Sequence, residues 1–302
     1  MCVTGFSLLN QMSLRLFKKA ISNPEYIIPY IVKKSRVKEL RYSSLKNKYQ
    51  RHKWKRIAGT QNLSVSVQGY NLQLNPSDYS ISRRLYFGES YEPLTTDFLT
   101  TELSEGDSFV DVGANIGYFS LLASSVVGNS GQVIAFEPEP QNFNILERNV
   151  VSNDLNGRVS LYQKALADSS ETLMLNHHPT NKGMHSIVSE FDHREDETEI
   201  EAIEGDSVLS EHIDIIKIDV EGAEPNVIRG LSSTLERCHP TIVFEYENRH
   251  WEEEITVIID MLTDIGYRLY GIVDETGERV SVEEIDENLR RVNIVAKHKN
   301  RV

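Results

Sequence analysis

A lysine and two carboxylates interrupt an apolar run in the second half of the chain. Lys217, Asp219 and Glu221 lie in or directly after the run Ile213-Asp-Ile-Ile-Lys-Ile-Asp-Val220. A lysine inside a buried strand is unfavourable unless it is paired, and carboxylates at a strand end lie where ligands bind in open α/β sheets. Asp219 is our first candidate for a general base, with Lys217 and Glu221 beside it. The alternative is a structural pairing of Lys217 with Asp219 or Glu245.

Two further expectations concern the same chemistry. His185 lies in the polar stretch 176–189, which carries three of the nine histidines and is expected to be a functional loop. It is our second candidate for the base. Asp219, Glu221 and Glu245 are hard oxygen ligands that suit a divalent ion. No metal site is predicted, however, because the histidines and the two cysteines lack zinc-ligand spacing.

A glycine-rich bend is expected to position a ligand. In Phe109-Val-Asp-Val-Gly-Ala-Asn-Ile-Gly-Tyr-Phe-Ser120, a buried strand ends at Asp111 and Val112 and a helix begins near Tyr118. Gly113, Asn115 and Gly117 form the bend, whose backbone N–H groups are expected to face the ligand. The alternative is an ordinary strand-to-helix turn.

A second strand, 131–138, ends in Glu137, which lies 24 residues after Gly113. A carboxylate at this place can accept two hydrogen bonds from a ribose diol. We therefore expect a nucleoside-containing cofactor rather than a carboxylate that only caps the following helix. Leu166, in the exit of the third strand, is a candidate contact for the base of that cofactor; the equal alternative is that the strand simply ends there.

The remaining periodicity predicts alternating strands and helices. The expected elements are a hairpin at 62–74, helices at 94–103, 118–127, 140–152, 222–235 and 252–265, and strands at 159–168, 213–220, 241–248, 267–273 and 292–297. The last two strands, joined by a hairpin-like connection, should form an antiparallel edge. The five strands listed here and the two strands that precede Gly113 and Glu137 make a sheet of seven.

Charged residues are unevenly distributed along the 302-residue chain. Residues 1–60 carry fourteen Lys/Arg and two acids, although the whole chain has a net charge of −13. Three parts are expected: a basic helical segment 1–60, a hairpin and helix 61–104, and a cofactor-binding domain 105–302. The acidic remainder makes nucleic acid an unexpected partner.

The basic segment also bears on location. Residues 12–56 mix basic clusters with apolar patches, which suits either peripheral contact with an anionic membrane or packing on the protein's own acidic body. No apolar stretch approaches the roughly 18 residues of a membrane-spanning helix, and the N-terminus lacks the order of regions typical of a signal peptide. A cytoplasmic protein, peripheral to the membrane at most, is expected.

Three motifs in order resemble the FkbM family of S-adenosylmethionine-dependent methyltransferases. They are Phe109–Ser120, Phe136-Glu-Pro-Glu-Pro-Gln-Asn-Phe143 with Asn149-Val150, and Ile216-Lys-Ile-Asp-Val-Glu-Gly-Ala-Glu-Pro225. The resemblance runs from about Gly88 to Lys297. It implies a Rossmann-like, seven-stranded class I methyltransferase sheet, mostly parallel with an antiparallel last strand. Residues 1–60 lie outside the resemblance, and the N-terminal helical segment and the β-hairpin are expected from the periodicity alone.

The resemblance also implies chemistry. The expected reaction is methyl transfer from S-adenosyl-L-methionine to a hydroxyl of a sugar, a glycan or a related secondary metabolite. Asp111, Gly113, Asn115 and Gly117 would hold the methionine part of the cofactor, and Glu137 its ribose. Asp219 and Glu221 would line the reaction centre.

Two other classes of function are weighed against this one. A non-catalytic cofactor-binding or membrane-surface partner of a glycan assembly system would bind the cofactor without transferring a methyl group. A dehydrogenase is disfavoured because Asn115 and Tyr118 stand where a dinucleotide-binding loop has its second and third glycines.

Overall fold

The computed structural model describes residues 39–57, 63–177, 185–187, 197–247, 255–273, 278–281 and 292–301. The chain divides into two compact units, Met1–Ile57 and Ala58–Val302. In the first, helix α4 (Glu39–Ile57) carries part of the basic segment. Residues 1–38 lie outside the described part, and with them most of the region expected to contact a membrane.

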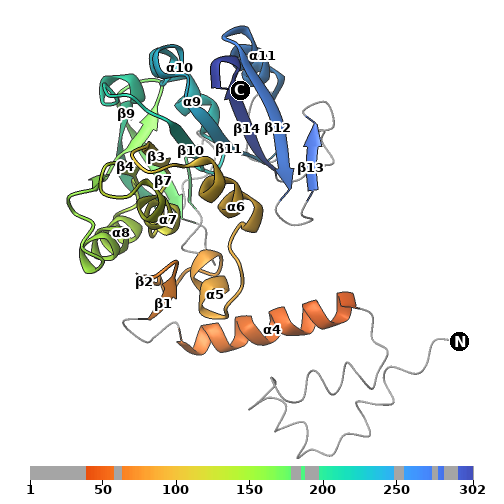
Figure 1. Ribbon diagram of the computed structural model, residues 1–302. Coiled ribbons are helices and arrows are strands. Elements are labelled where there is room, and N and C mark those ends of the chain that lie inside the picture. Colours follow the sequence, from red (N-terminus) through yellow and green to blue (C-terminus); the bar gives the residue numbers. More distant parts are fainter. Residues whose placement is uncertain are drawn as a thin grey trace, which may run out of the picture. The chain divides into compact units, whose positions relative to one another are not determined.

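An eight-stranded sheet forms the centre of the second unit (Figure 1). Its strands, in spatial order, are β13 (Glu278–Ser281), β12 (Tyr267–Val273), β14 (Val292–His298), β11 (Thr241–Tyr246), β10 (Ile215–Ile218), β3 (Ser108–Val112), β4 (Gln132–Phe136) and β5 (Val159–Tyr162). The five strands from β11 to β5 run parallel, and β14 is antiparallel to both of its neighbours. This confirms the predicted seven-stranded sheet, to which β13 adds an edge strand.

Side chains alternate along the strands between an apolar face of the sheet and a face that carries charged residues. One face carries an apolar cluster shared with helices α9 (Glu224–Arg229), α10 (Ser232–Cys238) and α11 (Ile255–Asp264). Its sheet residues include Val110, Val112, Ile216, Ile218, Ile242 and Phe244. Because successive side chains of a strand point to opposite faces, Asp111, Lys217 and Glu245 point to the other face. Burying each large side chain of the cluster contributes about 1.5–3 kcal/mol.

Helix α7 (Tyr118–Val127) packs on β3 and β4 and contacts α6 (Pro93–Glu102). Helix α8 (Pro140–Ser152) follows β4 and contacts the hairpin strand β2 (Tyr70–Gln73), which pairs with β1 (Ser64–Val67). The short helix α5 (Ile81–Tyr86) connects this hairpin to α6. The predicted hairpin and the helices at 94–103, 118–127 and 140–152 are confirmed.

A second sheet was not predicted. It contains β6 (Ala165–Ala167), β9 (Glu197–Glu204), β7 (Glu171–His177) and β8 (His185–Ile187), in this order. The predicted strand at 159–168 is confirmed as β5 over Val159–Tyr162. Its exit was expected to be irregular, but it forms β6, which pairs in parallel with β9. The expected loop at 176–189 is also partly wrong, since β7 and β8 form an antiparallel pair; residues 178–184 and 188–189 lie outside the described part.

The other helical segments are short. Two 3₁₀ turns, η1 (Gly205–Ser207) and η3 (Lys299–Arg301), follow β9 and β14. Among the described residues, no helix is both long enough and apolar enough to cross a membrane.

Candidate active site

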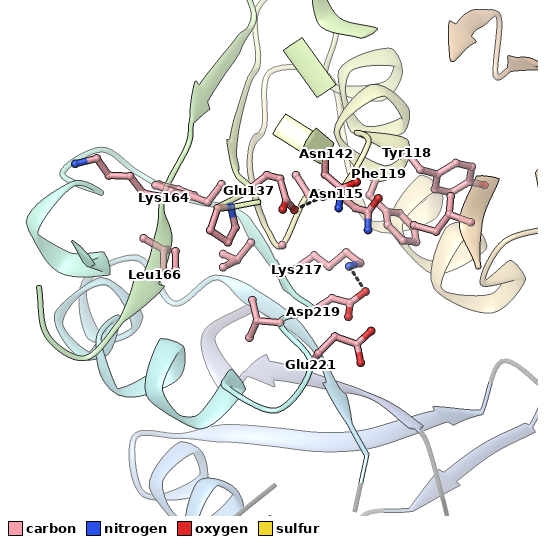
Figure 2. A pocket seen from close by; sticks show the side chains of 18 of the residues that line it. Asn115, Tyr118, Phe119, Glu137, Asn142, Lys164, Leu166, Lys217, Asp219 and Glu221 are labelled. Atoms are coloured by element: carbon pink, nitrogen blue, oxygen red, sulfur yellow. Dashed lines mark hydrogen bonds and ion pairs between the residues drawn. The ribbon is translucent and has the colours of Figure 1, made fainter. Parts of the chain in front are cut away.

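The sheet register brings Lys217 together with carboxylates. Lys217 on β10 is the direct partner of Asp111 on β3, so both side chains lie on the face that α7 covers. The Lys217 ammonium donates to Asp219 Oδ2 at 3.1 Å and lies 4.7 Å from the centre of the Phe119 ring. Figure 2 shows this pair beside Glu221. The lysine is 3% exposed and is held by an ion pair and a cation–π contact.

Charge explains why the lysine stays protonated there. Burial favours the neutral amine, but the nearby carboxylates of Asp219, Asp111 and Glu92 outweigh burial and raise the pKa of Lys217. Burial also raises the pKa of Asp111, although Lys217 and a 2.6 Å hydrogen bond from Ser120 Oγ oppose the shift. The arrangement keeps a protonated lysine directly beside the Asp219 carboxylate.

Asp219 and Glu221 belong to a tightly fixed strand exit. Glu221 and Gly222 both have positive φ, 54° and 109°. The buried Glu224 carboxylate accepts hydrogen bonds from the amides of Val220 and Gly222 at 2.9 and 3.0 Å. Glu224 therefore fixes the backbone that carries both candidate catalytic acids, a role that no sequence signal had indicated.

Three carboxylates converge at this exit. Oxygen atoms of Asp219, Glu221 and Glu245 lie within 4.8 Å of one another. This spacing could accommodate a divalent cation, for which carboxylate oxygens are suitable ligands. The Lys217 ammonium, bonded to Asp219, already supplies one positive charge to the cluster.

The glycine bend differs from expectation in its hydrogen bonds. The Gly113 and Ala114 amides both donate to the Phe136 carbonyl, and the Gly117 amide donates to the Ala114 carbonyl. The Asn115 amide donates to Glu137 Oε2 at 2.8 Å, and the Ile116 amide to the Asn115 side chain. The prediction that these amides face a ligand is therefore wrong. The bend instead shapes the crevice and orients Glu137.

Glu137 is buried at the end of β4. One carboxylate oxygen accepts from the Asn115 amide, and the other accepts from the Glu139 amide at 2.9 Å. Burial raises the pKa of Glu137 to about 8, because desolvation outweighs these two hydrogen bonds. Glu139, not Glu137, caps α8 through the Asn142 amide. The alternative of Glu137 as that helix cap is thus wrong.

A crevice runs between the ends of β3, β4, β10 and β6 (Figure 2). It is lined by Gly113, Asn115, Glu137, Leu166, Lys217, Asp219 and Glu221, all of which the sequence had suggested. Further lining residues that sequence reasoning missed are Ser80, Ile81, Tyr91, Tyr118, Phe119, Phe136, Asn142, Lys164 and Leu175. Tyr118 and Phe119 directly follow the glycine bend, which could have indicated them.

Some predicted site residues lie elsewhere. Asp111 and Gly117 are not among the residues that line the crevice. Asp111 is 1% exposed and lies beneath the crevice, where its charge favours the protonated form of Lys217, which lines the crevice. It also accepts a hydrogen bond from Ser120. His185 begins β8 and pairs through its backbone with His177. The side chain of His185 lies outside the described part of the structure.

Gly113 allows the strand ends to approach each other. A Cβ at this position would lie 1.9 Å from the Asp219 carbonyl oxygen, and φ is +79°. We expect Gly113→Ala to lower the free energy of unfolding by more than about 3 kcal/mol, through clash and backbone strain together. Gly157→Ala is the matched control, since no atom lies within 4 Å of its Cβ position. Equal urea midpoints for the two variants would contradict the described close approach.

The sheet order, the glycine bend after β3 and the acid at the end of β4 define a class I methyltransferase fold. The Methyltransferase FkbM domain model matches residues 111–269. The chain therefore belongs to the FkbM family of S-adenosylmethionine-dependent methyltransferases, and is a methyltransferase.

Several characterised proteins are similar to this chain. Methyltransferase sdnD of Sordaria araneosa is 28% identical over 212 residues, which cover 59% of this chain and 76% of that protein. Hexuronic acid methyltransferase AglP of Haloferax volcanii is 30% identical over 150 residues, covering 48% and 58%. The 31-O-demethyl-FK506 methyltransferase FkbM of Streptomyces tacrolimicus is 30% identical over 163 residues, covering 43% and 61%.

Among solved structures, methyltransferase FkbM from Methylobacillus flagellatus aligns with a TM-score of 0.44 at 14% identity. The alignment covers 73% of this chain and 55% of that one.

Proposed function

We propose that this protein transfers the methyl group of S-adenosyl-L-methionine to a hydroxyl oxygen of a sugar, a glycan or a related secondary metabolite. The observation that carries the proposal is the placement of Asp219. Its carboxylate lines the crevice and is paired with a buried lysine. Asp219 directly follows β10, the strand beside the one that leads into the glycine bend.

The crevice has the chemistry that this cofactor needs. Glu137 offers a buried carboxylate for ribose hydroxyls, and Phe136 and Leu166 offer apolar surface for an adenine ring. The acidic groups Asp219 and Glu221 complement a positive charge. When bound, S-adenosylmethionine supplies an electrophilic methyl group on a sulfonium.

The protein's own residues position the acceptor hydroxyl and take up its proton. The crevice holds the acceptor hydroxyl in line with the methyl group, and positioning of this kind can supply roughly 7–11 kcal/mol. Asp219 accepts the proton of the hydroxyl as the oxygen attacks, a contribution of about 10²–10⁴-fold. Lys217 and Glu224 position Asp219, one through the ion pair and the other through the backbone that follows.

The proposed acceptor class rests on the relatives and on the crevice. AglP is named for a hexuronic acid and FkbM of Streptomyces tacrolimicus for an oxygen of FK506. In this chain the crevice is bordered by Tyr91, Tyr118 and Phe119, whose ring centres lie 5.0–6.0 Å apart. Aromatic rings beside carboxylates suit the apolar face and the hydroxyls of a sugar.

The test uses S-adenosylmethionine with an isotope-labelled methyl group. The protein is incubated with neutral glycosides, a glycan extract and a glucuronide, and products are analysed by mass spectrometry. We expect a labelled, alkali-stable methyl ether on a hydroxyl. An alkali-labile methyl ester or labelled nitrogen would contradict O-methylation of a hydroxyl. Cofactor binding without transfer to any acceptor would favour the non-catalytic scaffold instead.

A further inference from the structure

The free edge of the hairpin is completed by side chains rather than by another strand. Strand β2 pairs with β1 on one side. On its other side, the Asn71 amide donates to Asn153 Oδ1 at 2.9 Å and its carbonyl accepts from Asn153 Nδ2 at 3.0 Å. Gln73 makes the same two bonds with Asn149, at 2.7 and 3.1 Å.

The geometry of the two elements explains this ladder. Asn149 and Asn153 are four residues apart on and just after α8, a rise of about 6 Å. Asn71 and Gln73 are two residues apart on a strand, a rise of about 7 Å. Each asparagine carboxamide can therefore act as one peptide group of a missing neighbouring strand.

Each asparagine makes a third bond, and only that of Asn149 reaches the glycine bend. Asn153 Nδ2 also donates to the Asn149 carbonyl at 2.7 Å. Asn149 Nδ2 also donates to the Ile116 carbonyl, in the glycine bend, at 2.7 Å. Asn149 is fully buried, so any bond it loses leaves a buried polar group unsatisfied. One side chain thus joins the hairpin edge to the bend that orients Glu137.

The hairpin continues directly into the crevice wall. Asn75, just after β2, donates through Nδ2 to Asn142 Oδ1 at 3.1 Å. The buried Asp78 carboxylate accepts from the Ser80 and Ser82 amides, both at 2.6 Å. Ser80 lines the crevice. This segment precedes the matched family domain, yet it shares the site.

We propose that Asn149 is a positioning residue that couples docking of the β1–β2 hairpin to cofactor binding at the glycine bend. The inference rests on the proposed function, since it assumes that this crevice holds the cofactor. Coupling of binding free energies is reciprocal. A docked hairpin strengthens cofactor binding, and bound cofactor holds the hairpin edge and the wall that begins at Ser80.

Two matched variants test the proposal in the full chain. Asn149→Asp and Asn153→Asp each keep an oxygen for the β2 amide and lose the donor to the β2 carbonyl, but only the first also loses the bond to Ile116. We expect Asn149→Asp to weaken binding of S-adenosylhomocysteine by about 5- to 150-fold, the typical range for a coupling free energy between two sites. Asn153→Asp should change it by less than about 3-fold, as expected for a partly exposed hydrogen bond.

Calorimetry and thermal unfolding are measured on both variants. A merely structural role would lower the stability of both and leave their affinities alike, which would overturn the proposal. Absence of binding in the unchanged protein would instead overturn the proposed function. If Asn149→Asp does not fold, hydrogen exchange of the unchanged protein decides. S-adenosylhomocysteine should slow exchange of the Gln73 amide more than that of the Asn71 amide, and equal slowing would contradict the coupling.

Discussion

Replacing Asp219 with Asn is expected to lower kcat by about 10²–10⁴-fold, the contribution of a general base. Asparagine keeps an oxygen that can accept the hydrogen bond from Lys217, but it cannot take the proton of the acceptor hydroxyl. Affinity for S-adenosylhomocysteine should stay within about 3-fold, since this change leaves the glycine bend and Glu137 intact. Steady-state kinetics and calorimetry on the same preparation measure both quantities.

The neighbouring carboxylates provide the control for this experiment. If Asp219 acts alone as the base, Glu221→Gln should lose much less activity. If the three clustered carboxylates hold a required metal, Glu221→Gln and Glu245→Gln should lose as much as Asp219→Asn, and a chelator should abolish activity. Full turnover in Asp219→Asn would remove this residue from the mechanism.

Replacing Glu137 with Gln is expected to weaken cofactor binding by about 10²-fold or more. Hydrogen bonds to a charged group contribute roughly 1.5–3 kcal/mol each, and ribose hydroxyls would donate two of them. Glutamine has one acceptor oxygen fewer, and its NH2 group would face one of the two backbone N–H groups that donate to the Glu137 carboxylate. Glu139→Gln is the control, because Glu139 caps α8 without lining the crevice.

The pH dependence follows from the raised pKa of Glu137, about 8. Because ribose hydroxyls would favour the ionised carboxylate, affinity for the cofactor should rise with pH up to about 8, and binding should release protons below that pH.

The free energy of unfolding of the free protein should show the opposite dependence on pH. The folded state keeps a proton that the unfolded chain has lost above its pKa of 4.5, so this group's contribution to stability falls as pH rises through about 8. Glu137→Gln should flatten the affinity profile and reduce the slope of the stability profile, part of which remains because burial raises the pKa of Glu224 to about 7.

Sequence reasoning succeeded where local signals and sheet geometry agree. Helices α7 and α8 begin and end where the periodicity placed them. Asp219, Glu221 and Glu245 converge because carboxyl ends of neighbouring parallel strands meet at one edge. The pairing of Lys217 with a carboxylate was predictable because a buried lysine requires one.

The misses have physical causes. Strands β6 and β8 have only three residues each, and all four strands from β6 to β9 pair across intervals that depend on tertiary contacts, so the periodicity did not reveal a second sheet. The destinations of the amides from Gly113 to Gly117 depend on the neighbouring Phe136 and Glu137, which spacing alone does not place. Ser80 lines the crevice at the end of a segment that is held by side-chain bonds from Asn149 and Asp78, for which no sequence motif exists.

A crystal structure of the protein with S-adenosylhomocysteine would test the proposed cofactor site most directly. We expect the ribose hydroxyls within hydrogen-bond distance of the Glu137 carboxylate, the adenine against Phe136 and Leu166, and the sulfur next to Asp219. Density for the ligand at another place, or a crevice closed by its own side chains under saturating ligand, would contradict the proposed site.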